Sequence, residues 1–354
     1  MSGDPVRIAV VGAGSVGRRH ADVIHRSPGC VLSAIVDPAP SAADFARSIG
    51  VVCHVSLDAL FRAGRPDGVL ISTPNRLHFE HALQCAAEAL PMLIEKPIAD
   101  TPERGLLICE AAEAAGVPVL VGHHRRHSNI IARATEIIAS GSLGRLVAFS
   151  GFALFYKGDR EGYFDGANAW RREAGGGPIL INMIHEIDSM RALCGEIAAV
   201  QAISSSAIRR FPVEDTATIL LRFANGALGT FVISDTAASN RSWEHTSSED
   251  ARYAKAHSDE DCYLVAGTMG SLAIPTMRIV GYGDVAGRSW REPFEKSVIA
   301  LSRSDPLERQ IAHFRDVIRG TAKPLVSARD GLQNLRIAEA IVRAARTGAT
   351  VETL

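Results

Sequence analysis

The sequence predicts an α/β chain in two parts, a doubly wound parallel sheet followed by an α+β domain with a large, mostly antiparallel open sheet. Three observations lead to this prediction. Strand-like and helical segments alternate over the first 125 residues. A glycine-rich turn directly follows the first apolar run. Beyond that point, strand-like runs follow one another with a single helix between them, which is typical of an antiparallel or mixed sheet.

Six apolar runs predict the parallel strands of the first part, at residues 6–11, 31–36, 51–55, 68–73, 91–94 and 117–121. Helical patterns separate them at residues 18–26, 41–49, 56–62, 77–90 and 101–115. We expect Ser56 to cap the third helix and Asp100 or Thr101 to cap the fifth, because short polar side chains accept hydrogen bonds from first-turn N–H groups.

The first 37 residues have the pattern of a complete dinucleotide-binding unit of the Rossmann type. Gly12 permits a tight turn, Gly14 lets the backbone approach a pyrophosphate, and Gly17 allows close packing of helix on strand. The helix that follows this turn, in which Ser15 and Val16 also lie, offers unpaired N–H groups and a positive dipole end to the phosphates. Asp37 ends the second strand, twenty positions after Gly17, where it can accept hydrogen bonds from an adenosine ribose.

Asp37 also favours NAD over NADP as the cofactor. A carboxylate repels a 2′-phosphate, so the dinucleotide without that phosphate is the expected ligand. Arg47 or another nearby base can offset the charge, which leaves NADP open.

Composition excludes several classes of function. The chain has 354 residues, 47% hydrophobic and 22% charged, with a formal net charge of −1. No basic footprint for nucleic acid or an anionic membrane is present, and the apolar runs are too short to span a bilayer. Six scattered cysteines without a C-x-x-C pair favour reduced thiols in a cytoplasmic protein over a disulfide framework or metal site. The N-terminus shows no secretory signal pattern, so we expect a cytoplasmic protein acting on a small molecule.

Polar groups follow three of the predicted parallel strands. They are Thr73-Pro74-Asn75 with His78, Glu95-Lys96-Pro97, and the run from Gly122 and His123 to Arg126. Ligands of open α/β sheets bind beyond the carboxyl ends of the strands, so these groups are expected at the cofactor and substrate site.

We place the domain boundary at residue 125, with an NAD-binding domain at 1–125 and a substrate-binding and oligomerisation domain at 126–354. Strands are predicted at 146–156, 199–207, 216–223 and 227–234, and Asn225-Gly226 predicts a type I′ hairpin turn. Helices are expected at 178–193, 306–319 and 332–347, and the last two can pack back on the first domain. Residues 243–261 are read as a loop. A sheet covered by one helix layer leaves a face for a homo-dimer or homo-tetramer.

Three polar residues of the 178–193 helix are candidates for chemistry. Asn182, His185 and Asp188 are spaced by three and predict one polar stripe among apolar residues, just after Gly175-Gly176-Gly177. Buried polar groups are costly unless satisfied or used, and an imidazole titrates near neutrality, as proton transfer from an alcohol requires. We therefore expect His185 to be an acid/base residue. A histidine and aspartate without a third ligand predict no metal site.

Taken together, these motifs resemble those of the Gfo/Idh/MocA family, the group of glucose–fructose oxidoreductase and inositol dehydrogenase. The matching features are Gly12-x-Gly14-x-x-Gly17-x-x-His20, Thr73-Pro74-Asn75-x-x-His78, Glu95-Lys96-Pro97, Trp170-Arg171 and the glycine run that leads to His185. The resemblance implies hydride transfer between a nicotinamide and a hydroxyl-bearing carbon of a sugar, inositol or related polyol. It implies that Lys96 touches the reacting oxygen, that His185 takes the proton, and that the Lys96–Pro97 bond is often cis.

The expected cofactor contacts are Gly12, Gly14, Ser15, Val16, Gly17, Asp37, Thr73, Pro74, Asn75, His78, Glu95 and Lys96. The expected catalytic residues are Lys96, His185, Asn182 and Asp188, and the expected substrate contacts are His123, Tyr163, Trp170 and Arg171. Aromatic and arginine side chains stack on sugar faces and donate to hydroxyls.

One position departs from the pattern of the resembled family. Many members carry an aspartate four residues before the histidine, and that position is Ile181 here. Asn182 substitutes by hydrogen bonding alone, or Asp188 supplies the orienting carboxylate, or the chemistry is altered. Two other functions stay open for the whole protein. It is a non-catalytic NAD-binding regulatory protein on the same fold, or a dihydrodiol or imine oxidoreductase.

Overall fold

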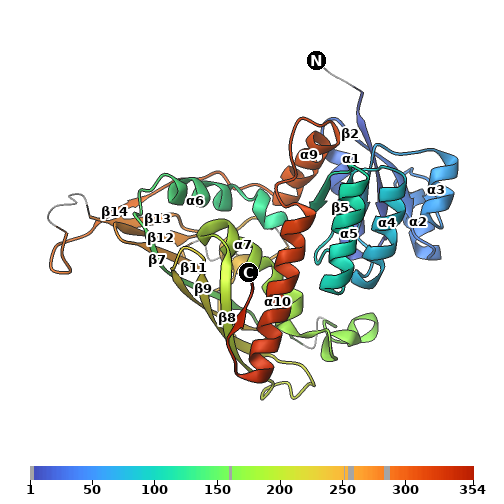
Figure 1. The fold of residues 1–354 in the computed structure, drawn as a ribbon. Coiled ribbons are helices and arrows are strands. Elements are labelled where there is room, and N and C mark those ends of the chain that lie inside the picture. Colours follow the sequence, from blue (N-terminus) through green and yellow to red (C-terminus); the bar gives the residue numbers. More distant parts are fainter. Residues whose placement is uncertain (1–3, 159–161, 251, 254–258, 283–287) are drawn as a thin grey trace. The chain divides into compact units, whose positions relative to one another are not determined.

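The computed structural model describes residues 4–158, 162–250, 252–253, 259–282 and 288–354 (Figure 1). It divides into two compact units. The first contains residues 1–127 and 306–335, and the second contains residues 128–305 and 336–354. The segment 306–335 therefore belongs to the unit of the parallel sheet, although it lies near the other end of the sequence.

The first unit is built on a six-stranded parallel sheet, as the alternation of strands and helices predicts. Its strands are β1 (Val6–Val11), β2 (Cys30–Val36), β3 (Cys53–His54), β4 (Gly68–Ile71), β5 (Met92–Ile94) and β6 (Val119–Val121), in the order β3-β2-β1-β4-β5-β6. Val69, Leu70 and Ile71 of β4 are completely buried, which explains why the central strands are continuous apolar runs. The order changes direction between β1 and β4, the position where open α/β sheets bind ligands.

The helices of the first unit lie mostly between these strands, and two of them, α3 and α5, begin at caps that the sequence predicts. They are α1 (Ser15–Arg26), α2 (Pro40–Ser48), α3 (Leu57–Ala63), η1 (Asn75–Leu77), α4 (His78–Ala87), α5 (Pro102–Ala114), η2 (His124–His127) and α9 (Pro306–Ile318). The Ser56 side chain accepts a hydrogen bond from Ala59 N and caps α3. Of the two candidates for α5, Thr101 is the cap, since its side chain accepts from Arg104 N.

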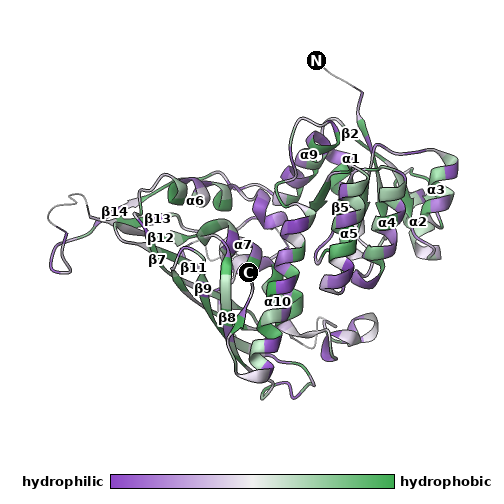
Figure 2. Cartoon of the chain, in the orientation of Figure 1, coloured by the Kyte–Doolittle hydropathy of each residue, from purple (hydrophilic) through white to green (hydrophobic). Residues whose placement is uncertain are grey.

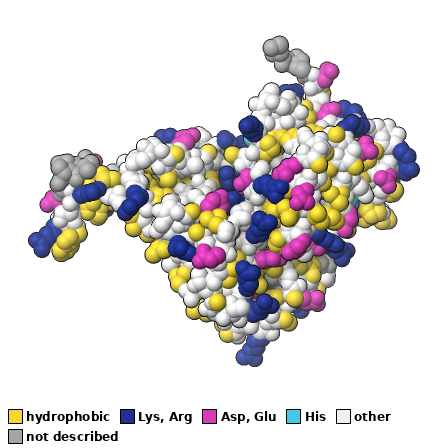
Figure 3. Space-filling model, viewed as in Figure 1, with side chains coloured by type: hydrophobic (Ala, Val, Ile, Leu, Met, Phe, Trp, Pro, Cys, Tyr) yellow, Lys and Arg dark blue, Asp and Glu magenta, His cyan; other side chains and the backbone are white. Residues whose placement is uncertain are grey.

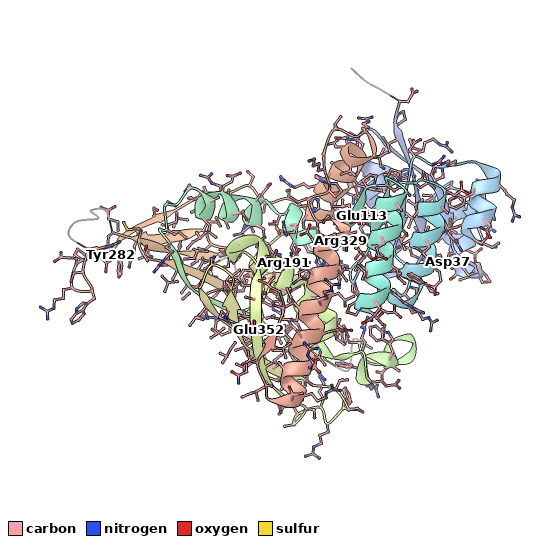
Figure 4. The ribbon with its side chains drawn as sticks, in the orientation of Figure 1. Asp37, Glu113, Arg191, Tyr282, Arg329 and Glu352 are labelled. Carbon is pink, nitrogen blue, oxygen red and sulfur yellow. The ribbon has the colours of Figure 1, made fainter. Side chains whose placement is uncertain are left out.

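The long helix α10 (Ala328–Thr347) contributes to both units, through Leu335 to the first and from Arg336 to the second. In Figure 2 hydrophobic and hydrophilic residues alternate along it, the pattern of a helix that buries one face. Its first turn is joined to α5, because Arg329 Nε and Nη2 donate to the two carboxylate oxygens of Glu113 at 2.7 Å each (Figure 4).

The second unit contains a nine-stranded, mostly antiparallel sheet. Its strands are β7 (Leu146–Leu154), β8 (Ile197–Ser205), β9 (Thr216–Phe223), β10 (Leu228–Ser234), β11 (Tyr263–Gly267), β12 (Gly270–Ile274), β13 (Arg278–Gly281), β14 (Glu295–Val298) and β15 (Val351–Glu352). Their order is β14-β13-β12-β11-β7-β10-β9-β8-β15, and β7 with β10 is the parallel pair among those described. The sequence predicts four of these strands and misses the five short ones.

The helices of this unit are α6 (Asn129–Ala139), η4 (Gly166–Arg172), η5 (Ile179–Met183), α7 (Ile184–Cys194) and α8 (Trp243–Thr246). Helix α6 was not predicted, although Ser128 caps it and four apolar residues at helical spacing are buried. Residues 243–261 are not entirely a loop, because α8 starts there. Trp243 is buried and stacks on Tyr263 at 5.7 Å. Residues 251 and 254–258 of that segment lie outside the described residues.

The predicted turn type between β9 and β10 is wrong, although the hairpin itself is present. Gly226 has a φ of 88°, whereas Asn225 is absent from the positive-φ positions that a type I′ turn requires. Gly226 N donates to Phe223 O, and Phe223 N donates to Ala227 O, which makes a three-residue loop with glycine in the left-handed position. The Asn225 side chain instead donates to Cys194 O at 2.8 Å.

Charged side chains of both signs and free cysteines are found among the described residues. Dark blue and magenta side chains are interspersed on the face that Figure 3 shows. All six cysteines are free, and burial raises the pKa of the Cys85 and Cys194 thiols to about 12. In the part of the chain that the structure describes, no helix combines the length and hydropathy needed to cross a bilayer.

Candidate active site

The glycine turn between β1 and α1 is packed so closely that two of its glycines have no room for a side chain. A Cβ at Gly17 would lie 1.9 Å from Gly12 O, and one at Gly12 would lie 2.8 Å from Thr73 N. Gly12 also has a φ of 93°, which disfavours other residues. These contacts hold the start of α1 against β1 and the end of β4.

Gly14 differs, because it faces open space. It is the N-cap of α1, and no described atom lies within 4 Å of a Cβ built on it. Ser15 and Val16 are exposed. Among the described residues no side chain caps this helix, and its first turn holds no acid. The backbone N–H groups and the dipole of α1 are therefore available to an anion, which fits the pyrophosphate of a dinucleotide.

Asp37 lies at the end of β2 beside this turn. Its Oδ2 accepts from Ala13 N and its Oδ1 from Ala39 N, both at 2.8 Å. Each carboxylate oxygen has a second lone pair, so Asp37 fixes the turn and still has acceptors for ribose hydroxyls. Arg47 is exposed and pairs with Asp44 at 2.8 Å, so its charge is partly neutralised within its own helix. The residues present fit NAD.

The turn after β4 is braced by His78. Pro74 is the N-cap of η1, and Asn75 is exposed there. His78 is completely buried, and its two ring nitrogens lie 2.9 Å from Thr73 O and Pro97 O. Burial lowers the pKa of His78, although both carbonyl oxygens favour the charged form. His78 thus ties the turn after β4 to the turn after β5.

Glu95 and Lys96 follow β5, and the Lys96–Pro97 peptide bond is cis. Glu95 Oε1 lies 2.7 Å from His20 Nε2, and its Oε2 accepts from Lys96 N at 3.2 Å. Burial alone raises the pKa of Glu95, but the His20 hydrogen bond, and after it the charge of Lys96, lower it to about 2. A carboxylate therefore stands beside Lys96 at working pH.

The segment after β6 adds two histidines to the first unit. His123 is buried, and its Nε2 lies 3.2 Å from Asn334 Nδ2 of α10. Burial, together with the charge of Arg125, lowers the pKa of His124 to about 3, so its imidazole is neutral at working pH. His123 was predicted to contact substrate, and the structure places its ring in the core of the first unit.

In the second unit, the predicted polar stripe begins in a π turn. Residues Ile179–Met183 form η5, and α7 continues from Ile184. The wider turn changes the angle between Asn182 and His185, so a spacing of three does not by itself put them on one helical face. His185 and Asp188 are buried, whereas Asn182 is only partly buried.

Asn182 contacts a lysine that the sequence did not single out. Lys157 Nζ donates to Asn182 Oδ1 at 2.8 Å and to Tyr163 OH at 2.6 Å. The ammonium also lies 4.0 Å from the centre of the Tyr163 ring. Because Asn182 Oδ1 accepts a hydrogen bond from Lys157, the amide nitrogen of Asn182 points away from Lys157 and can donate hydrogen bonds.

Tyr163 is in contact with two cations, Lys157 and Arg171. The Arg171 guanidinium is 4.0 Å from the ring centre, and Arg171 Nη1 donates to Tyr163 O at 3.0 Å. Burial raises the pKa of Tyr163 to about 12, so its hydroxyl stays protonated. Trp170, the residue before Arg171, is 45% exposed.

The glycine run before the helix serves close packing within the second unit. A Cβ at Gly176 would lie 2.4 Å from Arg171 O, and one at Gly177 would lie 2.5 Å from Glu214 Oε1. Glu214 in turn accepts from Ile179 N at 2.9 Å, which satisfies the start of the helix. Burial raises the pKa of Glu214.

Sequence reasoning missed three residues here, Lys157, Glu214 and the role of His20. Their partners are 25, 35 and 75 positions away in the chain, so no local pattern indicates these contacts. Within the described ranges, no three His, Cys, Asp or Glu side chains are grouped as a metal site.

Both halves of the chain are similar to known proteins. Residues 6–123 match the oxidoreductase family with an NAD-binding Rossmann fold, and residues 131–273 match the GFO/IDH/MocA C-terminal domain. The chain is 30% identical to 1,5-anhydro-D-fructose reductase of Ensifer adhaerens, with 98% of each chain covered. It is 27% identical to inositol 2-dehydrogenase of Rubrobacter xylanophilus, over 100% of this chain and 96% of that one.

Solved structures share the fold. Levoglucosan dehydrogenase, in complex with NADH and levoglucosan, superposes with a TM-score of 0.78 at 24% identity, over 99% of this chain and all of that one. A putative NADPH-dependent oxidoreductase from Desulfitobacterium hafniense gives a TM-score of 0.81 at 20% identity, over 99% of this chain and 98% of that one.

Two glycine substitutions separate binding from folding at the turn. Gly14→Ala should fold normally, since the space beside Gly14 is open, and should weaken NADH binding about tenfold by intruding on the pyrophosphate. Gly17→Ala should lower the free energy of unfolding by about 3 kcal/mol, because its methyl collides with Gly12 O. Fluorescence titration with NADH and urea unfolding measure the two effects. Equal NADH affinity of Gly14→Ala and the unaltered protein would contradict the assignment.

Proposed function

Since this chain belongs to the Gfo/Idh/MocA oxidoreductase family, we propose that it transfers a hydride between NAD and a secondary alcohol or ketone of a sugar, inositol or related polyol. The observation that carries the proposal is Lys96 at the end of β5, beside an ionised Glu95 and in the same sheet as the open glycine turn. Relatives with reductase and dehydrogenase names support the reaction type. The first unit binds the dinucleotide, and the second unit supplies most of the substrate contacts.

Lys96 is the residue that polarises the reacting oxygen. A lysine ammonium donates hydrogen bonds and carries positive charge, so it stabilises negative charge that develops on a substrate hydroxyl. Glu95 holds the backbone of Lys96 and keeps a negative charge beside it. Bound NAD would accept the hydrogen of the substrate carbon at its nicotinamide.

His185 is the residue that accepts the hydroxyl proton, and in the reverse direction it returns that proton to a ketone. Asp188 is buried on the same helix, three residues later, and is the carboxylate that we assign to stabilise an imidazolium. At the position of Ile181 there is no carboxylate, and Asn182 takes part through its amide, which Lys157 orients.

Tyr163, Trp170 and Arg171 form the substrate-recognition segment. The protonated Tyr163 hydroxyl and the exposed Trp170 ring suit a sugar, which offers both hydroxyls and an apolar face. Lys157 and Arg171 both contact the Tyr163 ring, so the segment is held before a substrate arrives.

The activity test uses the purified protein with NAD and a panel of sugars, inositols and diols, with NADH absorbance as the signal. We expect turnover of at least one member. Lys96→Ala and His185→Ala should each reduce kcat by about 10²–10⁴-fold, as for acid–base residues, with NADH affinity nearly intact. Lys323→Ala, which removes an exposed lysine of the segment between α9 and α10, is the matched control and should leave kcat unchanged.

A flat trace over the whole panel would contradict the proposal and favour a non-catalytic NAD-binding protein. Turnover of a dihydrodiol or an imine, with no turnover of sugars or inositols, would contradict the proposed polyol substrate class. Full activity of both alanine variants would remove Lys96 and His185 from their roles.

We further propose that the protein is a cytoplasmic homo-oligomer, a dimer or a tetramer that associates through the nine-stranded sheet. One face of this sheet packs on the core, while the opposite face exposes Leu220, Leu228 and Leu264 by 49, 60 and 44%. A contiguous apolar face of this kind marks an association surface, and a second copy offers the same face. The free cysteines support a reducing compartment.

Leu228→Lys should shift the protein to smaller species, because the new charge would be desolvated at the interface. Analytical ultracentrifugation measures the change. Ile208→Lys, at a 72% exposed position in the turn after β8, is the matched control and should leave the mass unchanged. A monomer in the unaltered protein, or equal masses for all three proteins, would contradict association through this sheet.

A further inference from the structure

His20 is a completely buried histidine whose described hydrogen bond goes to Glu95. It lies in the second turn of α1, and its Nε2 is 2.7 Å from Glu95 Oε1. Its Nδ1 is buried and has no hydrogen-bond partner among the described residues. Burying a ring nitrogen without a hydrogen bond costs free energy, so we expect the other ring nitrogen, Nε2, to make a compensating interaction.

That other nitrogen faces a carboxylate that is itself largely buried. Glu95 is 14% exposed, and its second oxygen accepts from Lys96 N. A Cβ at Gly122 would lie 3.0 Å from Glu95 Oε1, so the carboxylate is confined from the β6 side as well. Glu95 therefore has two fixed contacts, His20 on α1 and the backbone of Lys96.

We propose that His20 is a positioning residue, which acts on Lys96 through Glu95 and holds the Lys96 side chain in its reactive arrangement. It touches neither cofactor nor substrate in this role. The inference rests on the proposed function of Lys96. Through Glu95, His20 connects α1, the helix that receives the pyrophosphate, to the end of β5, where Lys96 lies.

The alternative is that the imidazole only fills space between α1 and the sheet. The two roles make different demands on residue 20. Space filling needs an aromatic ring of similar size, which phenylalanine provides. Positioning needs an N–H donor at the place of Nε2, which glutamine provides and phenylalanine lacks.

The test compares His20→Phe with His20→Gln in the full-length protein. His20→Phe should lower kcat about 10- to 100-fold, the worth of a hydrogen bond to a charged group, with little change in KM. His20→Gln should restore most of the loss. NADH affinity, measured by fluorescence, should stay nearly constant in both, because the glycine turn is unaltered. His20→Asn, one methylene shorter, is a second loss variant should His20→Phe fold poorly.

The pH profile gives an independent measure of the same role. The ionisable groups that face Glu95 are His20 of α1, Lys96 of the same turn and His124 of η2. Without the His20 bond, burial raises the pKa of Glu95, so the carboxylate protonates at higher pH. The acid limb of kcat/KM should therefore move to higher pH in His20→Phe and stay in place in His20→Gln.

A double-mutant cycle with Glu95→Gln completes the test. If His20 acts through Glu95, His20→Phe should add little further loss to Glu95→Gln, whereas independent effects would multiply. Equal losses in His20→Phe and His20→Gln, with both melting temperatures lowered, or an unchanged kcat and acid limb in His20→Phe, would overturn the inference. An inactive unaltered protein, or an active Lys96→Ala variant, would instead overturn the proposed function.

Discussion

The parallel order of the first sheet is the constraint on which the site depends. All of its strands run in one direction, so β1, β4, β5 and β6 end at the same edge, where the glycine turn follows β1 and polar side chains follow the other three. The contact of Gly17 with Gly12 O lets α1 start directly at that edge. A bulkier residue at either glycine would push the helix away from the strand ends, and with it the N–H groups that receive phosphate.

Around this edge, buried side chains connect turns that are distant in sequence. His78 joins the turns after β4 and β5, and Glu95 joins α1 to Lys96. The second unit repeats the principle, since Lys157 joins Tyr163 to Asn182 and Glu214 holds the start of the helix. In each unit several residues beside the groups proposed for chemistry are held by neighbours before a ligand binds, which is how an enzyme reduces the entropic cost of orientation.

The sequence predicts the first unit well, because its signals are local. Apolar runs, the caps at Ser56 and Thr101, and the glycine turn depend on neighbouring residues only. The second unit is harder. Its missed strands are four or five residues long, or two in β15, and the sheet pairs β7 with β10 and β11, far apart in the chain. The π turn at Asn182 and the contacts of His20, Lys157 and Glu214 need the folded chain, so the motif identifies the candidate residues without their partners.

The most direct test of the account is a crystal structure of the protein with NAD and a polyol that it oxidises. Lys96 Nζ and a ring nitrogen of His185 should each lie about 2.6–3.2 Å from the same substrate oxygen, the range that proton transfer requires. A structure in which either atom lies beyond about twice that distance from the reacting oxygen would contradict the account.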